Sequence, residues 1–301
     1  MVNNPDKDDK AIGVIGLGNM GAGIARNLAH RFTPVLVWDT SADACDPFAS
    51  VEGVEVAAPR EIASRSDAVF FLVPNSRDIE DLLTGSESML ERMRGGTVIF
   101  DLTTSDPVHS KPLAEKVSGC SVTYMDGGMS GGAAGADAGT LTLMLGGDKD
   151  TFQAFTPVLD AIADRLFYMG PSGAGHTLKL ILNLVIHTNF LAVCEAGHMA
   201  KAAGIELGDM IDVFNVSNAR SFVSEVRFPK HILSGTWDGR SRVYNLHKDV
   251  GMAMELARSL GASAKLGAET CRFLARAVEA GMQEEDFTRL YAAFPDLRNN
   301  G

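Results

Sequence analysis

The segment Ala11-Ile-Gly-Val-Ile-Gly-Leu-Gly-Asn-Met-Gly-Ala-Gly-Ile-Ala25 is the most informative part of this chain for its fold. It begins as a short apolar run, passes through the pattern G-x-G-x-x-G at Gly16, Gly18 and Gly21, and continues into residues suited to a helix. A second apolar run, Val35-Leu-Val-Trp38, leads to an acidic residue. This order predicts a strand, a tight glycine turn, a helix, a second strand and an acid.

Each glycine of this turn has a physical role in binding a dinucleotide. Gly16 permits the turn, Gly18 lets the main chain approach a pyrophosphate, and Gly21 lets the helix pack close to the strand. The free N–H groups and the dipole of the helix N-terminus attract the phosphates. Asp39 follows Gly21 by 18 residues, where a carboxylate accepts hydrogen bonds from ribose hydroxyls. Because Asp39 would repel a 2′-phosphate and no Arg follows it, NAD is favoured over NADP.

Composition limits the class of protein. The 301 residues suit two domains, and the hydrophobic content of 46% supports a sizeable core. The 27 basic and 38 acidic residues give a net charge of −11, which argues against nucleic acid or an anionic membrane as the main partner. The segment Met1–Lys10 has the features of neither a signal peptide nor a transit peptide. Cys45, Cys120, Cys194 and Cys271 are scattered and predict buried thiols in a reducing compartment, so we expect a cytoplasmic protein.

Short apolar runs alternate with helical patterns as far as Gly170. The expected strands are residues 12–15, 35–38, 54–56, 68–73, 97–101, 122–126, 141–145 and 165–169. The runs lack polar alternation, which is typical of strands covered on both faces in a parallel sheet. The expected fold class is therefore α/β, a Rossmann-type doubly wound sheet followed by an all-α C-terminal domain. Residues 127–139, rich in Gly and Ala, are expected to form a loop.

After Gly170 the pattern becomes helical. A long helix is expected from about Ser172 to Ala203, and further helices at residues 207–215, 223–233, 246–260, 265–280 and 284–294. The expected domains are therefore residues 1–170, which bind NAD, and residues 171–301, which serve substrate binding and oligomerisation. Polar residues within the long helix, among them Asn183 and Glu195, predict a core helix and not a membrane span.

Lys179 and Asn183 are the most suggestive residues for chemistry. They are four apart, so they lie on one face of the long helix. The surrounding residues are apolar, and desolvation lowers the pKa of a lysine toward neutrality, which suits a proton donor and acceptor for a hydroxyl/carbonyl pair. Asn183 could orient the same oxygen. The alternative is a lysine whose amine reaches solvent.

Two further segments follow expected strands, where open α/β sheets bind ligands. The segment Asp126-Gly-Gly-Met-Ser-Gly-Gly132 offers the Ser130 hydroxyl and backbone N–H groups to a carboxylate, with a flexible glycine loop as the alternative. The hydroxyls of Thr103 and Thr104 could face the nicotinamide or the substrate.

Other charged and histidine residues give weaker signals. By itself, Lys248-Asp249 indicates a solvated charge pair near the start of a helix. His187 and His198 share a helix face, but no carboxylates complete a metal site, and no metal is predicted.

Together these segments resemble the β-hydroxyacid dehydrogenase family, which includes 3-hydroxyisobutyrate dehydrogenase. The resemblance covers nearly the whole chain, from Ile12 to about Phe294. It rests on G-L-G-N-M-G at 16–21, D-L-T-T at 101–104, D-G-G-M-S-G-G at 126–132, G-T-L-T at 139–142, G-x-G-x-x-x-K-L-x-x-N at 173–183 and Lys248-Asp249.

The resemblance implies a Rossmann domain and an all-helical domain with the active site in the cleft between them. It implies that Lys179 is the acid/base, that Asn183 supports it, and that Lys248 closes the site from the helical domain. The residues expected to bind substrate are Thr103, Ser130, Gly131, Gly132, Lys179 and Asn183. The residues expected to bind the cofactor are Gly16, Gly18, Asn19, Met20, Gly21, Asp39, Leu72, Val73, Pro74, Thr104 and Lys248. Family members usually form dimers or tetramers, so a homodimer or homotetramer is expected.

The expected function is that of an NAD-dependent oxidoreductase that interconverts a short β-hydroxy carboxylate and its semialdehyde or keto acid. The pair Gly127-Gly128 and His176 resemble the corresponding residues of 6-phosphogluconate dehydrogenase, so a sugar-acid dehydrogenase is an alternative function. That enzyme, however, has a His at the position of Leu182. A non-catalytic dinucleotide-binding sensor is a second alternative. Imine reductases share the fold but generally lack the lysine. Arg220 and Arg227 either bind a second anionic group or are surface charges, and we favour surface charges.

Overall fold

The computed structural model describes residues 8–298, which form two compact units. One unit extends to Lys179 and the other begins at Leu180, so the division falls within helix α10, Ala174–Ala202. Each unit has its own hydrophobic core. Residues 1–7 of the segment Met1–Lys10, in which we expect no targeting signal, lie outside the described residues.

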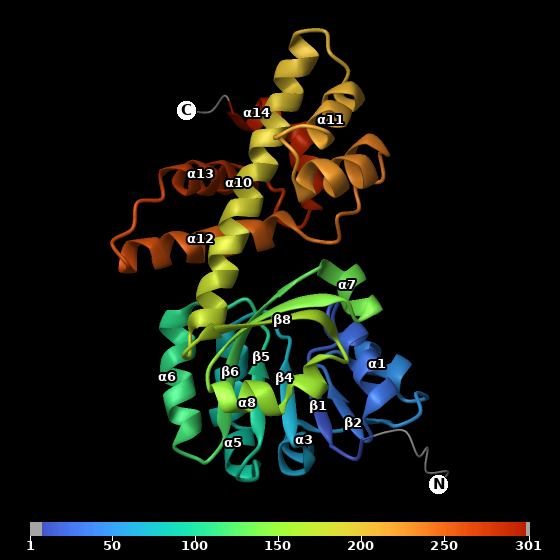
Figure 1. Ribbon diagram of the computed structural model, residues 1–301, viewed down its shortest axis with the longest axis vertical. Helices are drawn as coiled ribbons and strands as arrows, with labels where there is room; N and C mark the ends of the chain where they lie inside the picture. The colour runs from blue at the N-terminus through green and yellow to red at the C-terminus, as the bar shows by residue number, and fades with distance from the viewer. Residues whose placement is uncertain (1–7, 299–301) are drawn as a thin grey trace. The chain divides into compact units, whose positions relative to one another are not determined.

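The first unit is built on an eight-stranded sheet with the order β3-β2-β1-β4-β5-β6-β7-β8 (Figure 1). The strands are β1 Ile12–Ile15, β2 Val35–Trp38, β3 Val54–Val56, β4 Ala68–Phe71, β5 Val98–Asp101, β6 Thr123–Ser130, β7 Leu141–Gly146 and β8 Ala163–Gly170. All neighbours from β3 to β6 are parallel, and the order runs outward from β1 in both directions, as in doubly wound sheets. The predicted fold class is confirmed.

Two details of the prediction for this sheet are wrong. Strand β7 pairs with β6 antiparallel, with Ser130 opposite Thr142. The connection between them holds only the short helix α7, Gly132–Ala138, whereas parallel neighbours need a crossover of about a dozen residues or more. Residues 127–139 are therefore not a loop, because pairing with β7 extends β6 to Ser130 and α7 follows directly.

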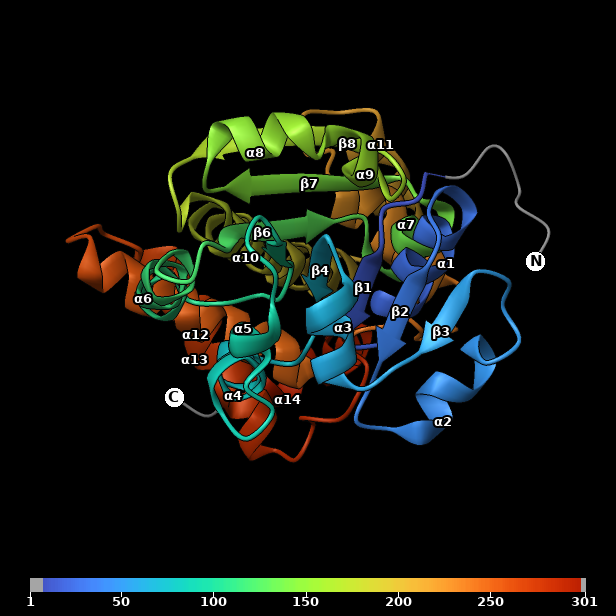
Figure 2. The ribbon, with the colours of Figure 1, turned by 90° about the horizontal axis from the view of Figure 1, so that it is seen from below.

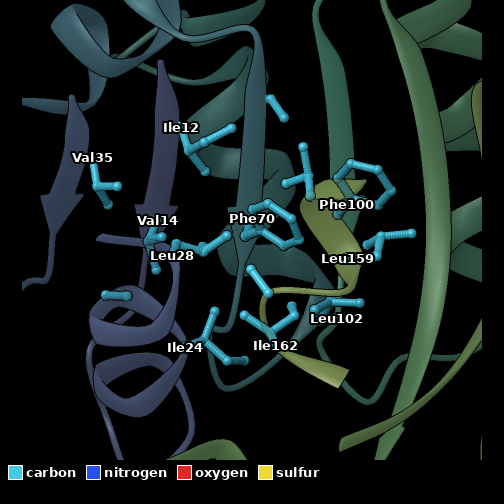
Figure 3. Packing of buried hydrophobic residues seen from close by; sticks show 14 of the residues in the cluster. Ile12, Val14, Ile24, Leu28, Val35, Phe70, Phe100, Leu102, Leu159 and Ile162 are labelled. Carbon is cyan, nitrogen blue, oxygen red and sulfur yellow. The ribbon is translucent and has the colours of Figure 1, made fainter. Parts of the chain in front are cut away.

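Helices pack on both faces of the sheet (Figure 2). Those of the first unit are α1 Gly21–Arg31, α2 Ala42–Cys45, α3 Pro59–Arg65, α4 Ser76–Thr84, α5 Met89–Arg92, α6 Pro107–Ser118, α7, α8 Lys149–Ala154 and α9 Thr156–Leu159. Successive strand residues point to opposite faces, so Val14 and Phe70 belong to one core and Ile15 and Phe71 to the other. Figure 3 shows the first of these cores, where the rings of Phe70 and Phe100 stack with centroids 4.9 Å apart.

The second unit is helical. Besides α10 it contains α11 Leu207–Asn215, the π-helix Val223–Leu233, α12 Val243–Ser259, α13 Lys265–Glu279 and α14 Leu290–Arg298. Residues 223–233 are π-helical where an α-helix is expected, and Pro229 within them lacks the N–H that an α-helix would use. The last helix begins later than expected, because Asp286 first pairs with Arg242 as an isolated bridge before a short 3₁₀ turn.

Helix α10 is long enough and apolar enough to cross a membrane, by length and composition alone. Its most apolar 18-residue window has a mean hydropathy of 1.6, and 33% of that window is buried. The core helix of a folded domain can have the same length and composition, so these two properties are weak evidence for a membrane span. Within the helical unit, Phe190 and Cys194 of α10 belong to the hydrophobic core.

Candidate active site

The turn between β1 and α1 packs tightly on one side and is open on the other. Gly16 has φ of +97°, and a Cβ there would lie 2.4 Å from the carbonyl oxygen of Leu72. A Cβ at Gly21 would lie 1.8 Å from the carbonyl oxygen of Gly16, so α1 starts directly against the turn. No atom lies within 4 Å of the position of a Cβ at Gly18. The turn therefore has the close packing and the accessible main chain that a dinucleotide pyrophosphate requires.

Asp39, directly after β2, is bonded to this turn. Its Oδ2 accepts a hydrogen bond from the N–H of Leu17 at 2.7 Å, and its Oδ1 accepts one from the N–H of Ser41 at 2.9 Å. Oδ1 also accepts the hydroxyl of Thr40 at 3.4 Å, whereas Oδ2 keeps a further lone pair, so Asp39 can still accept a hydrogen bond from a ribose hydroxyl. Asn19 is exposed and Met20 is half-buried in the same turn.

Leu72, Val73 and Pro74, predicted to bind the cofactor, directly follow β4. The N–H of Val73 donates to Oγ1 of Thr103 at 3.3 Å, which joins the end of β4 to the end of β5. Thr103 is only 3% exposed, whereas Thr104 is half-buried. The Thr103 hydroxyl thus links two strand ends inside the unit, and Thr104 has the more accessible hydroxyl.

Strand β6 ends at Ser130, in the turn that leads into α7. Gly131 has φ of +128° and Gly132 has φ of +62°, a region that favours glycine. Ser130 is half-buried and both glycines are exposed. The turn therefore presents a hydroxyl and backbone N–H groups, later in the sequence than the strand end expected at Asp126.

Lys179, in the first turns of α10, is bonded to strand β6. The Nζ of Lys179 donates a hydrogen bond to the carbonyl oxygen of Met129 at 2.7 Å. The lysine stem packs on the same strand, because a Cβ at Gly128 would lie 2.5 Å from the Cβ of Lys179. The acceptor belongs to the residue directly before Ser130, so the sheet unit brings the amine close to the turn predicted to bind substrate.

Asn183, one turn later on α10, is held within the helical unit. Its Nδ2 donates to Oδ2 of Asp249 at 2.7 Å, and both side chains are buried. The Nζ of Lys248 lies 3.6 Å from Oδ1 of the same carboxylate, with side-chain exposures of 23% for Lys248 and 12% for Asp249. Lys248-Asp249 is therefore not the solvated pair expected from the sequence, because α10 packs its asparagine against the carboxylate.

Two buried groups of the sheet unit have shifted pKa values. Burial raises the pKa of Asp101 above its usual range, although the neighbouring His176 opposes the shift. Burial, reinforced by the charge of Asp101, raises the pKa of Tyr124 well above its ordinary value. Tyr124 thus stays protonated, and its hydroxyl donates a hydrogen bond to Oδ2 of Asp101 at 2.5 Å.

The sequence-based prediction gives no role to the side chains of Asp101, Tyr124 or Asp126. All three side chains are buried. Asp126 accepts the N–H of His176 in the first turn of α10, and Asp101 accepts the hydroxyl of Tyr124. The available signal was a single acid near the carboxyl end of each of two neighbouring expected strands. That signal did not reveal which helix the acids would contact.

The two arginines that the sequence offers as anion-binding candidates, both in the helical unit, differ from each other. Arg220 is exposed and forms a 3.6 Å ion pair with Glu225, as a surface charge does. Arg227 is half-buried, donates to the carbonyl oxygen of Gly239 at 3.1 Å, and lies over the ring of Phe287. The expectation of a surface charge is therefore wrong for Arg227, which packs inside its unit.

Within residues 8–298, no group of three or more His, Cys, Asp or Glu side chains could hold a metal ion. Cys45 and Cys194 are buried, and burial raises the pKa of the Cys194 thiol well above its ordinary value. Cys120 is exposed and Cys271 is half-buried, so the expectation of buried thiols is wrong for these two. Cys120 lies in the turn after α6, outside the core.

A surface cavity of about 760 Å³ lies in the helical unit. Its lining includes His198, Lys201, Trp237 and Tyr291. No residue predicted to bind substrate or cofactor lines it.

Comparison with known proteins gives matches over both units. Residues 11–170 match the family model described as the NAD binding domain of 6-phosphogluconate dehydrogenase, and residues 173–294 match the model described as NAD-binding of NADP-dependent 3-hydroxyisobutyrate dehydrogenase. The chain is 32% identical to L-threonate dehydrogenase of Cupriavidus necator, over 96% of this chain and 98% of that one. It is 27% identical to mitochondrial 3-hydroxyisobutyrate dehydrogenase of Bos taurus, over 93% of this chain and 85% of that one. The solved structure of Mycobacterium tuberculosis 3-hydroxyisobutyrate dehydrogenase with L-serine has a TM-score of 0.86 and 25% identity, over 95% and 99% of the two chains.

These matches agree with the local geometry. The first matched segment contains the glycine turn, Asp39 and the Ser130 turn, and the second contains Lys179 and Asn183. The relatives align over nearly their whole length, so the likeness is not confined to a shared nucleotide-binding fold. The chain therefore belongs to the β-hydroxyacid dehydrogenase family, in which it is similar to 3-hydroxyisobutyrate dehydrogenase.

Proposed function

We propose that this protein is an NAD-dependent dehydrogenase that interconverts a short β-hydroxy carboxylate and its semialdehyde or keto acid, with Lys179 as the acid/base. The observation that carries the proposal is the 2.7 Å hydrogen bond from Nζ of Lys179 to Met129, directly before Ser130. It holds an amine close to a turn that can bind a carboxylate, in the unit that contains the glycine turn. Relatives named for 3-hydroxyisobutyrate and L-threonate support the substrate class.

The glycine turn and Asp39 have the shape and acceptors to bind NAD, which supplies the hydride acceptor when bound. Lys179 takes the hydroxyl proton of the substrate onto Nζ during oxidation and returns it during reduction. Ser130 and the N–H groups of Gly131 and Gly132 bind the substrate carboxylate. Asn183 uses one amide N–H for Asp249 and keeps a second N–H that can donate a further hydrogen bond.

Asp39 supports NAD as the preferred cofactor. Its carboxylate is fixed beside the turn by two backbone N–H groups and would repel a 2′-phosphate. The description of the family model matched by residues 173–294 names an NADP-dependent enzyme, so the test of this preference measures turnover with both cofactors. We expect a higher kcat/KM with NAD than with NADP. Asp39→Ala should reduce this difference in kcat/KM, because it removes the carboxylate that repels the 2′-phosphate of NADP. A preference for NADP in the unaltered protein would contradict this assignment.

The test of the reaction is the formation of NADH, measured by absorbance, with 3-hydroxyisobutyrate, L-threonate and L-serine. For the acid that is turned over, Lys179→Met should lower kcat by roughly 10²–10⁴-fold, the usual contribution of a general acid/base. Lys201→Met is the matched control, since Lys201 is exposed on the same helix. Near-normal turnover of Lys179→Met would contradict the mechanism. Binding of NAD without turnover of any of these acids would favour a sensor protein.

A sugar-acid dehydrogenase is the second candidate function. The match of residues 11–170 to the 6-phosphogluconate dehydrogenase model favours it. The Gly127-Gly128 pair is weaker support, because Gly128 has a packing reason in its contact with Lys179. Adding 6-phosphogluconate to the panel and measuring released CO₂ separates the candidates. Oxidation with decarboxylation would establish the second.

We further propose a homodimer or homotetramer that is located in the cytoplasm. Ile181 and Val185 on α10 are 45% and 62% exposed, and a second copy could cover them. Sedimentation should detect the oligomer, and Val185→Glu should weaken it; a monomer at micromolar concentration would contradict it.

The proposed location in the cytoplasm is supported by the free cysteines, which suit a reducing compartment, and cell fractionation tests it.

A further inference from the structure

A row of buried polar groups joins the end of β5 to the first turn of α10, and the mechanism proposed above gives no role to the side chains of Asp101, Tyr124 or His176. Oδ1 of Asp101 accepts the N–H of Thr103 at 2.9 Å, and Oδ2 accepts the hydroxyl of Tyr124 at 2.5 Å. Nε2 of His176 lies 3.2 Å from the backbone oxygen of Asp101. Asp101 and His176 are completely buried, and Tyr124 nearly so. The row thus connects the strand end that carries Thr103 to the helix that carries Lys179.

The neighbouring strand makes a second connection to the same helix turn. Asp126 on β6 is the register partner of Asp101 on β5. Its Oδ1 accepts the N–H of Gly173 at 2.5 Å, and its Oδ2 accepts the N–H of His176 at 2.9 Å. Because unpaired N–H groups and a positive dipole end occur at a helix N-terminus, this carboxylate caps α10.

The two connections act on different parts of His176. Asp126 bonds its main chain and that of Gly173, which fixes where the helix begins. The imidazole bonds the backbone oxygen of Asp101, and because a carbonyl only accepts, Nε2 carries the hydrogen. This bond from a side chain to the neighbouring strand adds a further constraint on rotation of the first turn about the helix axis. His176 and Lys179 are three residues apart, so they share one side of the helix.

We propose that His176 is a positioning residue for Lys179. Its hydrogen bond to β5 sets the rotation of the first turn of α10, and thereby the seating of the lysine stem on Gly128 and of the amine on Met129. Asp101, fixed by Tyr124, holds the acceptor in place. The proposal rests on the acid/base role of Lys179 proposed above, because the group that His176 positions is that amine. Displacements near 1 Å can lower turnover by up to about 10²-fold, so a single bond at this point has a measurable effect.

The test compares two substitutions of His176 by side chains of similar length. His176→Met removes the donor and should lower kcat about 10-fold, with the dissociation constant of NADH, measured by fluorescence, unchanged. His176→Gln keeps an N–H near the position of Nε2 and should recover most of kcat. Thermal unfolding reports whether each variant folds. Tyr124→Phe, which removes only a hydroxyl, is a second route to the same loss, with a smaller expected effect, if His176→Met does not fold.

The decisive measurement is a double-mutant cycle with Lys179→Met. If His176 acts through Lys179, His176→Met lowers kcat of the unaltered protein but not that of Lys179→Met. An equal loss in both backgrounds, or no loss in either, would overturn the positioning role while leaving the role of Lys179 intact. Normal turnover of Lys179→Met alone would overturn the proposed function and this inference together.

Discussion

Lys179 and Asn183 lie one turn apart on α10, yet two different units hold them by different means. The amine of Lys179 bonds a backbone carbonyl of β6 at 2.7 Å. The amide of Asn183 bonds the buried carboxylate of Asp249 on α12, also at 2.7 Å. The division between the compact units falls directly after Lys179. The two residues that the sequence joins as one motif therefore belong to two packing environments.

The difference shows which consequence to expect from each substitution. A backbone acceptor remains in place when the lysine is changed, so the sheet unit should keep its stability. Asp249 has a second partner in Lys248, but it loses a close donor when Asn183 is changed. Changes around Lys179 should therefore affect turnover, and changes around Asn183 should also affect stability.

Among substitutions in the surroundings of Lys179 and Asn183, the largest effect should come from Gly128→Ala. The added Cβ would meet the Cβ of Lys179 at 2.5 Å, and neither atom can rotate away, so the strand or the helix turn must shift. We expect kcat to fall by about 10²-fold, the scale of a misplacement near 1 Å. Gly208→Ala in α11 is the control, because no atom lies within 4 Å of its added Cβ. A folded Gly128→Ala protein with unaltered kcat would break the link between seating of the lysine and turnover.

Next in size is the loss of stability from Asn183→Ala. Removal of a donor to a buried carboxylate should lower the free energy of unfolding by about 2 kcal/mol. Urea unfolding measures it, with Asn189→Ala, half-buried on the same helix, as a control expected to change it by less than about 0.5 kcal/mol. Equal effects of the two substitutions would remove the distinction drawn for Asn183.

Asp101 gives a pH-dependent effect on the Lys179 side. Burial raises its pKa in the folded protein, so the folded state binds the proton more tightly than the unfolded state. Its contribution to stability is thus present at low pH and is lost as pH rises from about 4 through the raised pKa. Relative to the unaltered protein, the free energy of unfolding of Asp101→Asn should rise by on the order of 1 kcal/mol between pH 4 and pH 7. A stability difference that stays constant over this range in urea unfolding would contradict the shift.

The smallest effect should come from Lys248→Met. Its amine lies 3.6 Å from Asp249, which keeps its bond from Asn183. We expect a loss of about 0.5 kcal/mol in the free energy of unfolding, as for other partly solvated ion pairs. A loss as large as that of Asn183→Ala would mean that the lysine, and not the asparagine, is the main partner of the carboxylate.

Much of the fold could be predicted because its signals are local. The strands Ile12–Ile15, Val35–Trp38 and Val54–Val56 and the helix Leu207–Asn215 have the expected bounds, since apolar runs and turn residues mark their ends. The direction of β7 and the extension of β6 to Ser130 could not be predicted, because strand pairing joins residues distant in sequence. The site followed the same rule. Spacing identified Lys179 and Asn183, but their acceptors come from other elements.

The glycine turn, the acid that follows it and the spacing of lysine and asparagine follow from residue order alone, because turn geometry and helix periodicity act over a few residues. Three contacts depend on the folded arrangement: Asp126 caps α10, His176 bonds β5, and Asp249 is buried against Asn183. Each of these contacts joins residues at least 50 positions apart in the chain. Buried polar groups must find partners wherever packing places them, and packing is a property of the folded chain.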